Sequence, residues 1–342
     1  MTPKKMETDK RPEVVVITGA SSGIGRATAR RFARDGARIG LLARGKEGLE
    51  GAARDVESLG GEALPIPTDV SYPEQVEAAA AMVEERFGPI DIWINNAMAS
   101  VMSPVKEMRV EEYQRVTDVT YLGCVYGTLS ALKRMSPRDH GTIVQVGSAL
   151  AFRGIPLQSA YCAAKHAVQG FTESVRAELL HDKSKVWVTM VHLPAANTPQ
   201  FNWVKTRMPG QPQPYPPIFQ PEVPAEAIYY AAHHHRREML VGWPTLKTVL
   251  GNSLFPGYVD QVLADTAYEG QQSDSPVDPN RRDNLWKPVP ADFGAHGDFD
   301  RQAKSFSWLL WVDLHRKAVG MGLLTLAALG LAASRAFSKS KG

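Results

Sequence analysis

Short apolar runs and longer helical segments alternate along the chain from residue 14 to about residue 193. The run VVVI at residues 14–17 is typical of a buried strand, and RATARRFARDG after it is typical of a helix that ends at Gly36. Further strands are predicted at ARIGLLAR, EALPIPTDV, PIDIWINNA, GTIVQVGS and VWVTMVHL, with helical segments between them, one of them around residues 109–134. Residues 224–265 again have a helical pattern. Strands and helices in this order form βαβ units, which need a parallel sheet with helices on both faces. The sequence therefore predicts an α/β fold with a doubly wound parallel sheet in three layers, α/β/α.

Composition limits the classes of protein to which the chain can belong. Its 342 residues suffice for one large domain with appendages or for two small domains, and 44% hydrophobic with 22% charged residues is an ordinary globular balance. A net charge of +3 is too small to indicate nucleic acid. Cys124 and Cys162 form no disulfide framework, which favours a reducing compartment. The histidines of HHHRR, residues 233–237, point in different directions on a helix, so we predict no metal site.

The loop TGASSGIG, residues 18–25, lies between the first predicted strand and the first predicted helix. Glycines allow the backbone to approach a pyrophosphate closely, and the free amides at the start of the helix point toward it. The flanking strand and helix favour a dinucleotide-binding loop of the Rossmann type over a plain tight turn. The predicted phosphate-binding residues are Gly19, Ser21, Ser22, Gly23, Ile24 and Gly25.

The end of the second strand indicates which dinucleotide binds. An acid at this point binds the ribose of NAD, whereas an arginine accommodates the 2′-phosphate of NADP. The strand ends in LLAR, with Arg44 and no acid before Glu47, and Arg26 adds positive charge nearby. We therefore predict NADP(H) as the cofactor, with NAD as the less favoured alternative.

The stretch SAYCAAKHAVQG places Tyr161 and Lys165 four residues apart. On a helix these side chains lie on the same face, one above the other. A free phenol has a pKa of about 10, and a neighbouring ammonium favours the phenolate and lowers that pKa. Taken alone, the pair favours an incidental pair on a surface helix, because pairs at this spacing are common.

Four motifs together resemble those of the classical short-chain dehydrogenase/reductase family. They are TGASSGIG (18–25), NNA (95–97), Ser148 thirteen residues before the tyrosine, and YCAAK (161–165), and the resemblance extends from about residue 12 to residue 250. It implies an oxidoreductase that transfers a hydride between a nicotinamide and a carbonyl or secondary alcohol. Many members are dimers or tetramers, so the resemblance also implies a homo-oligomer.

The resemblance implies a role for each matching residue. Tyr161 is the general acid/base on the substrate oxygen, Lys165 lowers the tyrosine pKa and bonds the nicotinamide ribose, and Ser148 holds the substrate oxygen. A placed proton donor relieves the negative charge that builds on that oxygen. The remaining cofactor contacts are implied at Asp69 and Val70 for the adenine, at Asn96 and Ala97 behind the fourth strand, and at Pro194 and Thr198 beside the nicotinamide carboxamide.

The chain departs from the family pattern at three positions. Met98 replaces the glycine of NNAG, and Ala195 replaces the glycine after Pro194. Thr120 stands where many members have an asparagine that helps to hold a proton-relay water. A threonine can still hold a water through its hydroxyl or its carbonyl, or it can mean slower chemistry.

The predicted organisation has four parts. Residues 1–11 are a polar N-terminal tail without a secretory signal, residues 12–265 are the Rossmann domain, residues 266–305 are an extended linker, and residues 306–342 are a hydrophobic tail. Within the domain, residues 194–224 carry nine prolines with Phe201, Trp203, Tyr215 and Phe219. This stretch is either a lid over the substrate or a surface wrap whose aromatics pack on the body.

The hydrophobic tail predicts a membrane helix. Residues 318–334 carry no charge, and as a helix they span about 26 Å, at the short end for an apolar core of about 30 Å. Trp308 and Trp311 precede them, where an aromatic belt would fall. We expect a membrane-associated protein with a cytoplasmic catalytic domain. The alternatives are an interfacial helix, or a helix packed on the domain of a soluble cytoplasmic protein.

The predicted function is NADP-dependent reduction of a carbonyl on a lipophilic small molecule, because aromatic residues of the loop and the hydrophobic tail both suggest such a substrate. One alternative is an NAD-dependent alcohol or steroid dehydrogenase that runs toward oxidation. Another is a membrane-tethered dinucleotide-binding sensor or scaffold without turnover, which the three departures suggest.

Overall fold

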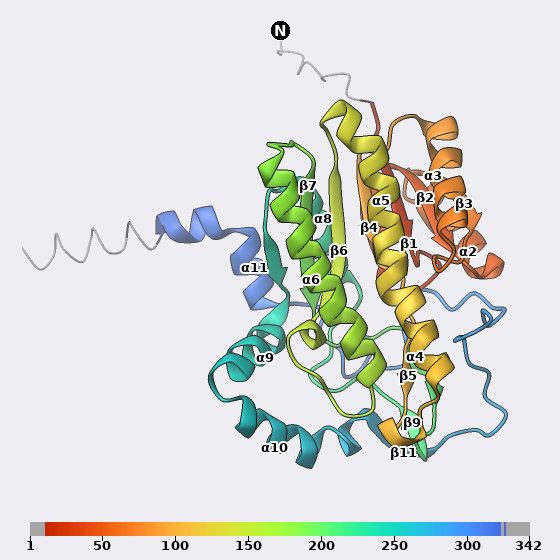
Figure 1. Cartoon of the computed structure of the whole chain (residues 1–342), viewed down its shortest axis with the longest axis vertical. Helices are drawn as coiled ribbons and strands as arrows, with labels where there is room; N and C mark the ends of the chain where they lie inside the picture. Colours follow the sequence, from red (N-terminus) through yellow and green to blue (C-terminus); the bar gives the residue numbers. More distant parts are fainter. Residues whose placement is uncertain (1–10, 323–324, 326–342) are drawn as a thin grey trace, which may run out of the picture.

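The computed structural model describes residues 11–322 and residue 325. Its centre is a parallel sheet of seven strands in the order β10-β7-β6-β4-β1-β2-β3 (Figure 1). The strands are β1 (Val14–Thr18), β2 (Arg38–Ala43), β3 (Glu62–Pro67), β4 (Ile92–Asn95), β6 (Thr142–Ser148), β7 (Trp187–Leu193) and β10 (Glu238–Leu240). This arrangement confirms the predicted doubly wound sheet. The order reverses between β1 and β4, which opens a crevice at the carboxyl ends of these strands.

Helices cover both faces of the sheet because alternate strand residues point to opposite sides. Val15 and Ile17 of β1 belong to one buried cluster, and Val14 and Val16 belong to the other. The first cluster lies under α1 (Gly23–Ala33), α2 (Lys46–Ser58) and α8 (Glu222–His233). The second lies under α3 (Pro73–Phe87), α4 (Val110–Thr117), α5 (Gly123–Met135) and α6 (Ser159–His181). Because helices cover both faces of the sheet, the domain has the predicted three layers, α/β/α.

Two helical predictions differ from the structure. The helix expected around residues 109–134 is divided into α4 and α5 by a π-helical turn, η2 (Asp118–Leu122). The expected helical region 224–265 contains the short strand β10, followed by α9 (Gly242–Leu254) and α10 (Pro256–Thr266). A three-residue strand is too short to show a period in the sequence, and its pairing with β7 holds it in place.

The proline-rich stretch 194–224 has short elements of its own. They are α7 (Gln200–Trp203), β8 (Lys205–Thr206), which pairs with β5 (Val101–Met102), and β9 (Gly210–Pro212). Phe201 is buried, whereas Phe219 lies in the main core rather than in a lid.

Residues 266–305, which the sequence suggests are an extended linker, lie against the domain instead. The strand β11 (Gln272–Pro276) pairs with β9, and the chain then follows the lower end of the sheet beside α2 and α4 before it reaches α11 (Trp308–Leu314) (Figure 1). Leu285 and Ala295 are buried along this course. A few separate apolar anchors hold the segment without producing any periodicity, which explains its linker-like composition.

The predicted membrane helix lies mostly outside the described residues. Among residues 11–322 and 325, no helix is both long and apolar enough to cross a membrane. The predicted belt residues lie on α11, where the side chains of Trp308 and Trp311 are 73% and 40% exposed.

Candidate active site

The loop between β1 and α1 has the form of a phosphate cradle. Gly19 and Gly23 have φ of 67° and 55°, which favour glycine. A Cβ on Gly25 would lie 2.2 Å from the carbonyl oxygen of Gly19, so the helix start and the loop approach too closely for any side chain. α1 begins here without a side-chain cap; the amide of Gly23 donates to the carbonyl oxygen of Gly294 at 3.2 Å, and the amide of Ile24 has no side-chain cap. These features fit the pyrophosphate of a dinucleotide.

The NNA motif supports this loop from the neighbouring strand. The Asn96 side chain donates to the carbonyl oxygens of Thr18 and Gly19 at 3.0 and 3.2 Å. The amides of Asn96 and Ala97 donate to the Thr18 hydroxyl at 2.9 and 3.0 Å. Asn96 therefore mainly holds the loop in place. It also lines the cleft between the glycine loop and the ends of β2, β3 and β4, which we call the cofactor cleft.

Arg44, Asp69 and Val70, which the sequence assigns to the adenosine end of the cofactor, all line this cleft. Burial alone would raise the pKa of Asp69, but hydrogen bonds from Arg115 and Ser71 outweigh it and hold that pKa below its ordinary value. The ion pair joins Arg115 Nη2 to Asp69 Oδ2 at 2.6 Å. Sequence reasoning missed Arg115, which comes from α4 and has no motif of its own.

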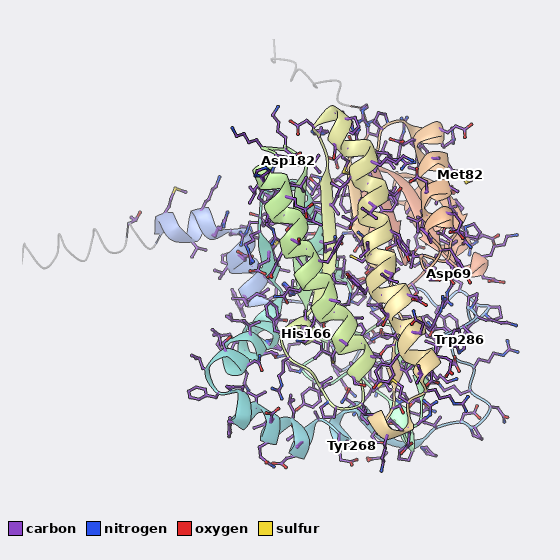
Figure 2. The ribbon with its side chains drawn as sticks, in the orientation of Figure 1. Asp69, Met82, His166, Asp182, Tyr268 and Trp286 are labelled. Atoms are coloured by element: carbon purple, nitrogen blue, oxygen red, sulfur yellow. The ribbon has the colours of Figure 1, made fainter. Side chains whose placement is uncertain are left out.

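The C-terminal segment also reaches this end of the cleft. Arg44 Nη1 donates to the carbonyl oxygens of Leu285 and Trp286, both at 3.2 Å. The Arg115 guanidinium lies 6.0 Å from the centre of the Trp286 ring, and Figure 2 shows Asp69 and Trp286 on the same side of the molecule. No motif predicts these contacts between residues about 170 to 240 positions apart, which only the fold brings together.

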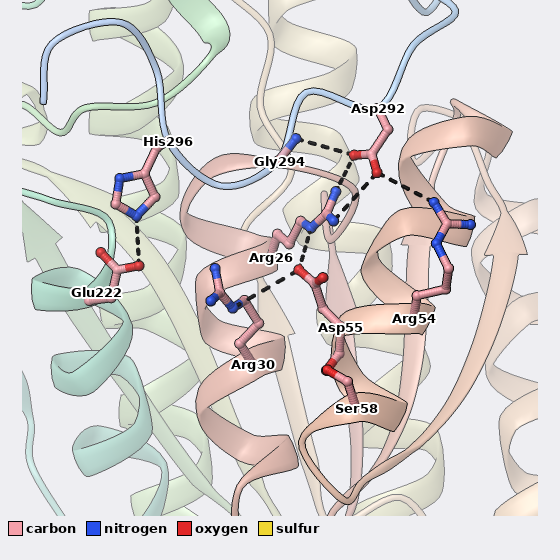
Figure 3. A network of polar contacts seen from close by, with 9 residues as sticks. All are labelled: Arg26, Arg30, Arg54, Asp55, Ser58, Glu222, Asp292, Gly294 and His296. Carbon is pink, nitrogen blue, oxygen red and sulfur yellow. Dashed lines mark hydrogen bonds and ion pairs between the residues drawn. The ribbon is translucent and has the colours of Figure 1, made fainter.

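Arg26 does not face the cleft, which corrects the prediction that it adds positive charge near the cofactor. Its side chain is 7% exposed, its Nε donates to Asp55 at 2.8 Å, and it also pairs with Asp292 (Figure 3). Two carboxylates thus neutralise the Arg26 guanidinium. Arg44, which lines the cleft, is the better candidate to bind a phosphate there.

Ser148, Tyr161 and Lys165 line one cavity of about 590 Å³. Ser148 ends β6, while Tyr161 and Lys165 lie in the first turns of α6, so the sheet edge and the helix bring them together. Lys165 Nζ donates to the carbonyl oxygen of Val146 at 2.6 Å and lies 5.7 Å from the centre of the Tyr161 ring. The three predicted catalytic residues are therefore neighbours.

Burial dominates the proton affinities of this site. It raises the pKa of Tyr161 above its ordinary value, and a hydrogen bond with Ser148 opposes that rise. Burial also lowers the pKa of Lys165 to about 8. The expected lowering of the tyrosine pKa by the ammonium is absent from this structure, because Val146 takes the ammonium's bond and burial prevails. A phenol in this state keeps its proton at neutral pH and is suited to donate it.

The departures from the family pattern have distinct surroundings. The Thr120 hydroxyl donates to the carbonyl oxygen of Ala99 and accepts from its amide, both at 3.0 Å. That hydroxyl thus uses its proton and one of its two lone pairs on the backbone, so it has no proton left to donate to a relay water. Met98 and Ala195 both line the cavity that holds Tyr161.

The cofactor cleft and the catalytic cavity adjoin. Residues that line both are Ile24, Asn96, Met98, Thr198 and Gln200. The two spaces are therefore continuous, and a dinucleotide held on the glycine loop would extend toward the cavity that holds Tyr161.

The far wall of the catalytic cavity comes from α9 and α10. Its lining includes Lys247, Phe255, Tyr258, Val259 and Leu263, together with Phe201 and Tyr215 from the proline-rich stretch. Trp203 lines the cofactor cleft instead. The sequence does not predict that α9 and α10 line the cavity, because their apolar residues indicate only that these helices pack against another part of the protein.

The fold and the site define an α/β oxidoreductase, and comparison with known proteins identifies the family. The family model described as short chain dehydrogenase matches residues 13–208. An uncharacterized oxidoreductase, YxnA, of Bacillus subtilis is 36% identical over 276 residues, which cover 80% of this chain and 78% of that protein. This chain belongs to the short-chain dehydrogenase family.

Another relative and two solved structures are also similar to this chain. A fatty acyl-CoA reductase of Acinetobacter baylyi is 33% identical over 64% of this chain and 72% of its own length. A metagenomic short-chain oxidoreductase in complex with NADP has a TM-score of 0.57 at 26% identity, covering 68% of this chain and 96% of that one. An NAD+-bound xylitol dehydrogenase has a TM-score of 0.52 at 29% identity, covering 54% and 71%.

Proposed function

We propose that this protein uses NADPH to reduce a carbonyl group on a lipophilic substrate. The observation that carries the proposal is the meeting of Ser148, Tyr161 and Lys165 on one wall of a cavity that adjoins the glycine-loop cleft. Bound NADPH would supply the hydride. The Ser148 hydroxyl holds the substrate oxygen, and Tyr161 gives it a proton as negative charge builds there. Lys165 lies beneath Tyr161 and binds the nicotinamide ribose.

Arg44 supports NADPH over NADH. It lies at the end of β2 and lines the cleft, and its hydrogen-bond partners among residues 11–322 and 325 are all neutral carbonyl oxygens. The Asp69 carboxylate acts on this guanidinium only through space and is itself paired with Arg115, so Arg44 can attract the 2′-phosphate. The other proposed cofactor contacts are those of the glycine loop, residues 19 and 21–25, with Asp69, Val70, Asn96 and Thr198.

The catalytic cavity supports a lipophilic substrate. Its volume of about 590 Å³ lies within the range of about 300–1,000 Å³ for small-molecule pockets, and aromatic and aliphatic side chains of α9 and α10 form its far wall. The relative named as a fatty acyl-CoA reductase is consistent with a long-chain carbonyl substrate. We therefore favour a long-chain aldehyde or ketone.

The test follows NADPH absorbance with the full chain against long-chain, steroid-like and small polar carbonyls. Tyr161→Phe should lower kcat by about 10²–10⁴-fold, since a general acid contributes that much. Tyr126→Phe, on α5 and outside both cavities, is the matched control. Consumption that is equal in the wild type and Tyr161→Phe would contradict the proposal. NADPH binding without turnover would favour the sensor alternative, and faster alcohol oxidation with NAD would favour the dehydrogenase alternative.

We also propose that the part from residue 306 onward associates with a membrane surface and leaves residues 12–265 on the cytoplasmic side as the catalytic domain. Phe306, Trp308 and Trp311 are exposed on or beside α11, and α11 contacts α9, whose neighbour α10 lines the cavity. A lipophilic substrate would then enter from the membrane side. Flotation of the full chain with anionic vesicles tests this. A homo-oligomer is proposed on the family resemblance, and sedimentation velocity tests it.

A further inference from the structure

Residues 284–294, which we call the strap, cross the cofactor cleft. Strap residues that line the cleft are Asn284, Pro288, Val289, Ala291 and Phe293, opposite the glycine loop and Arg44. The space left between them is about 200 Å³, which is below the roughly 300–1,000 Å³ of pockets that take drug-sized ligands. The strap therefore narrows the part of the cleft beside the glycine loop and Arg44, where the adenosine half of a dinucleotide would lie.

One end of the strap is fastened to α1 and α2 by charge. The Asp292 carboxylate pairs with the buried guanidinium of Arg26 and lies 3.6 Å from that of Arg54 (Figure 3). The carbonyl oxygen of Gly294 accepts from the amide of Gly23 at 3.2 Å, inside the phosphate loop itself. A Cβ on Gly51 would lie 2.0 Å from the Asp292 carboxylate, so only glycine on α2 leaves room for this contact.

The other end of the strap is fastened to Arg44. The carbonyl oxygens of Asn284, Leu285 and Trp286 all accept from its guanidinium. The Leu285 side chain is fully buried in the cluster that includes Val70. Neutral carbonyls orient a guanidinium without cancelling its charge, and two of its five donors stay free for a phosphate.

We propose that the strap is a gate over the adenosine half of the cofactor cleft, with Asp292 as its latch and with its carbonyl oxygens positioning Arg44. This inference rests on the proposed use of a nicotinamide dinucleotide. The gate must open for the cofactor to enter or leave. Once closed, it encloses the adenosine and holds Arg44 at the 2′-phosphate. Asp292 is a positioning residue, since it acts through the strap and through Arg26.

The experiment compares Asp292→Asn with the wild type as full chains. The variant keeps the size of the side chain but removes its charge, and Arg26 retains Asp55 as a partner. Glu222→Gln is the matched control, because it removes an exposed pair with His296 just beyond the strap. Two quantities are measured: hydrogen exchange of the strap amides without cofactor, and the dissociation rate of NADPH by stopped-flow fluorescence.

We expect faster exchange in the strap of Asp292→Asn and an NADPH dissociation rate about tenfold higher, the scale of one charge-assisted hydrogen bond. Glu222→Gln should change neither. Unchanged strap exchange would overturn the latch, and faster exchange with unchanged dissociation would overturn the gate. If the wild type binds no NADPH, both the proposed cofactor and the gate are contradicted. Hydrogen exchange of the strap amides would still test whether Asp292 is the latch.

Discussion

The cofactor cleft and the catalytic cavity lie side by side at one edge of the sheet, but they are built differently. The cleft is formed by the glycine loop, by Arg44 and other residues at the ends of β2, β3 and β4, and by mainly apolar residues of the strap. The cavity has Ser148, Tyr161 and Lys165 on one wall and apolar side chains of α9 and α10 on the other. The cleft thus suits a fixed, charged ligand, and the cavity suits an apolar ligand that the fold itself does not specify.

Among the effects that compare the two spaces, the largest concerns Lys165, which lines the catalytic cavity. Burial lowers its pKa to about 8 in the folded protein, below its value in the unfolded chain. Between pH 8 and about 10.5 the unfolded chain therefore binds more protons, so stability rises with pH through this window. The free energy of unfolding of the wild type should rise relative to Lys165→Met by up to about 3 kcal/mol.

Chemical denaturation without cofactor at closely spaced pH values measures this difference. Parallel curves for the wild type and Lys165→Met across the window would show that the ammonium is not desolvated. The cavity wall around Lys165 would then be as accessible to water as the cofactor cleft, and the two spaces would not differ in how strongly they desolvate a charge.

A smaller effect is expected in the cleft. Arg44→Ala should raise the KM for NADPH by about 10- to 100-fold, as one charge-assisted contact is worth about 1.5–3 kcal/mol, and should change the KM for NADH far less. Steady-state kinetics with both cofactors measures the ratio. Lys46→Ala, an exposed cation nearby, is the control. An equal loss with both cofactors would mean that Arg44 acts on the strap alone.

The smallest effect is expected in the catalytic cavity. Leu263→Ser removes part of an apolar wall, so the KM for a long-chain aldehyde should rise about fivefold while that for a short one stays the same. Leu254→Ser is the control, because Leu254 is 65% exposed and lies outside the lining. If the KM for short and long aldehydes rises alike, the wall acts on folding rather than on chain length.

Local patterns in the sequence determined much of this protein. The glycine loop, the NNA motif, Ser148 and the Tyr161–Lys165 spacing are readable because each depends on neighbours a few residues away or on one strand and the helix that follows it. The alternation of strands and helices likewise required the doubly wound sheet, since parallel strands need crossover helices. Family membership follows from the same residues.

Only the tertiary structure determined which distant residues contact the site and how strongly the site is buried. Arg26 is paired with Asp292 rather than aimed at the cleft, and Arg44 is held by carbonyl oxygens some 240 residues away. Likewise, burial rather than the neighbouring ammonium dominates the pKa of Tyr161. Each outcome depends on which distant segment packs against the site and how much water it removes. A segment with few apolar anchors, such as the strap, leaves no periodic trace in the sequence that would predict its course.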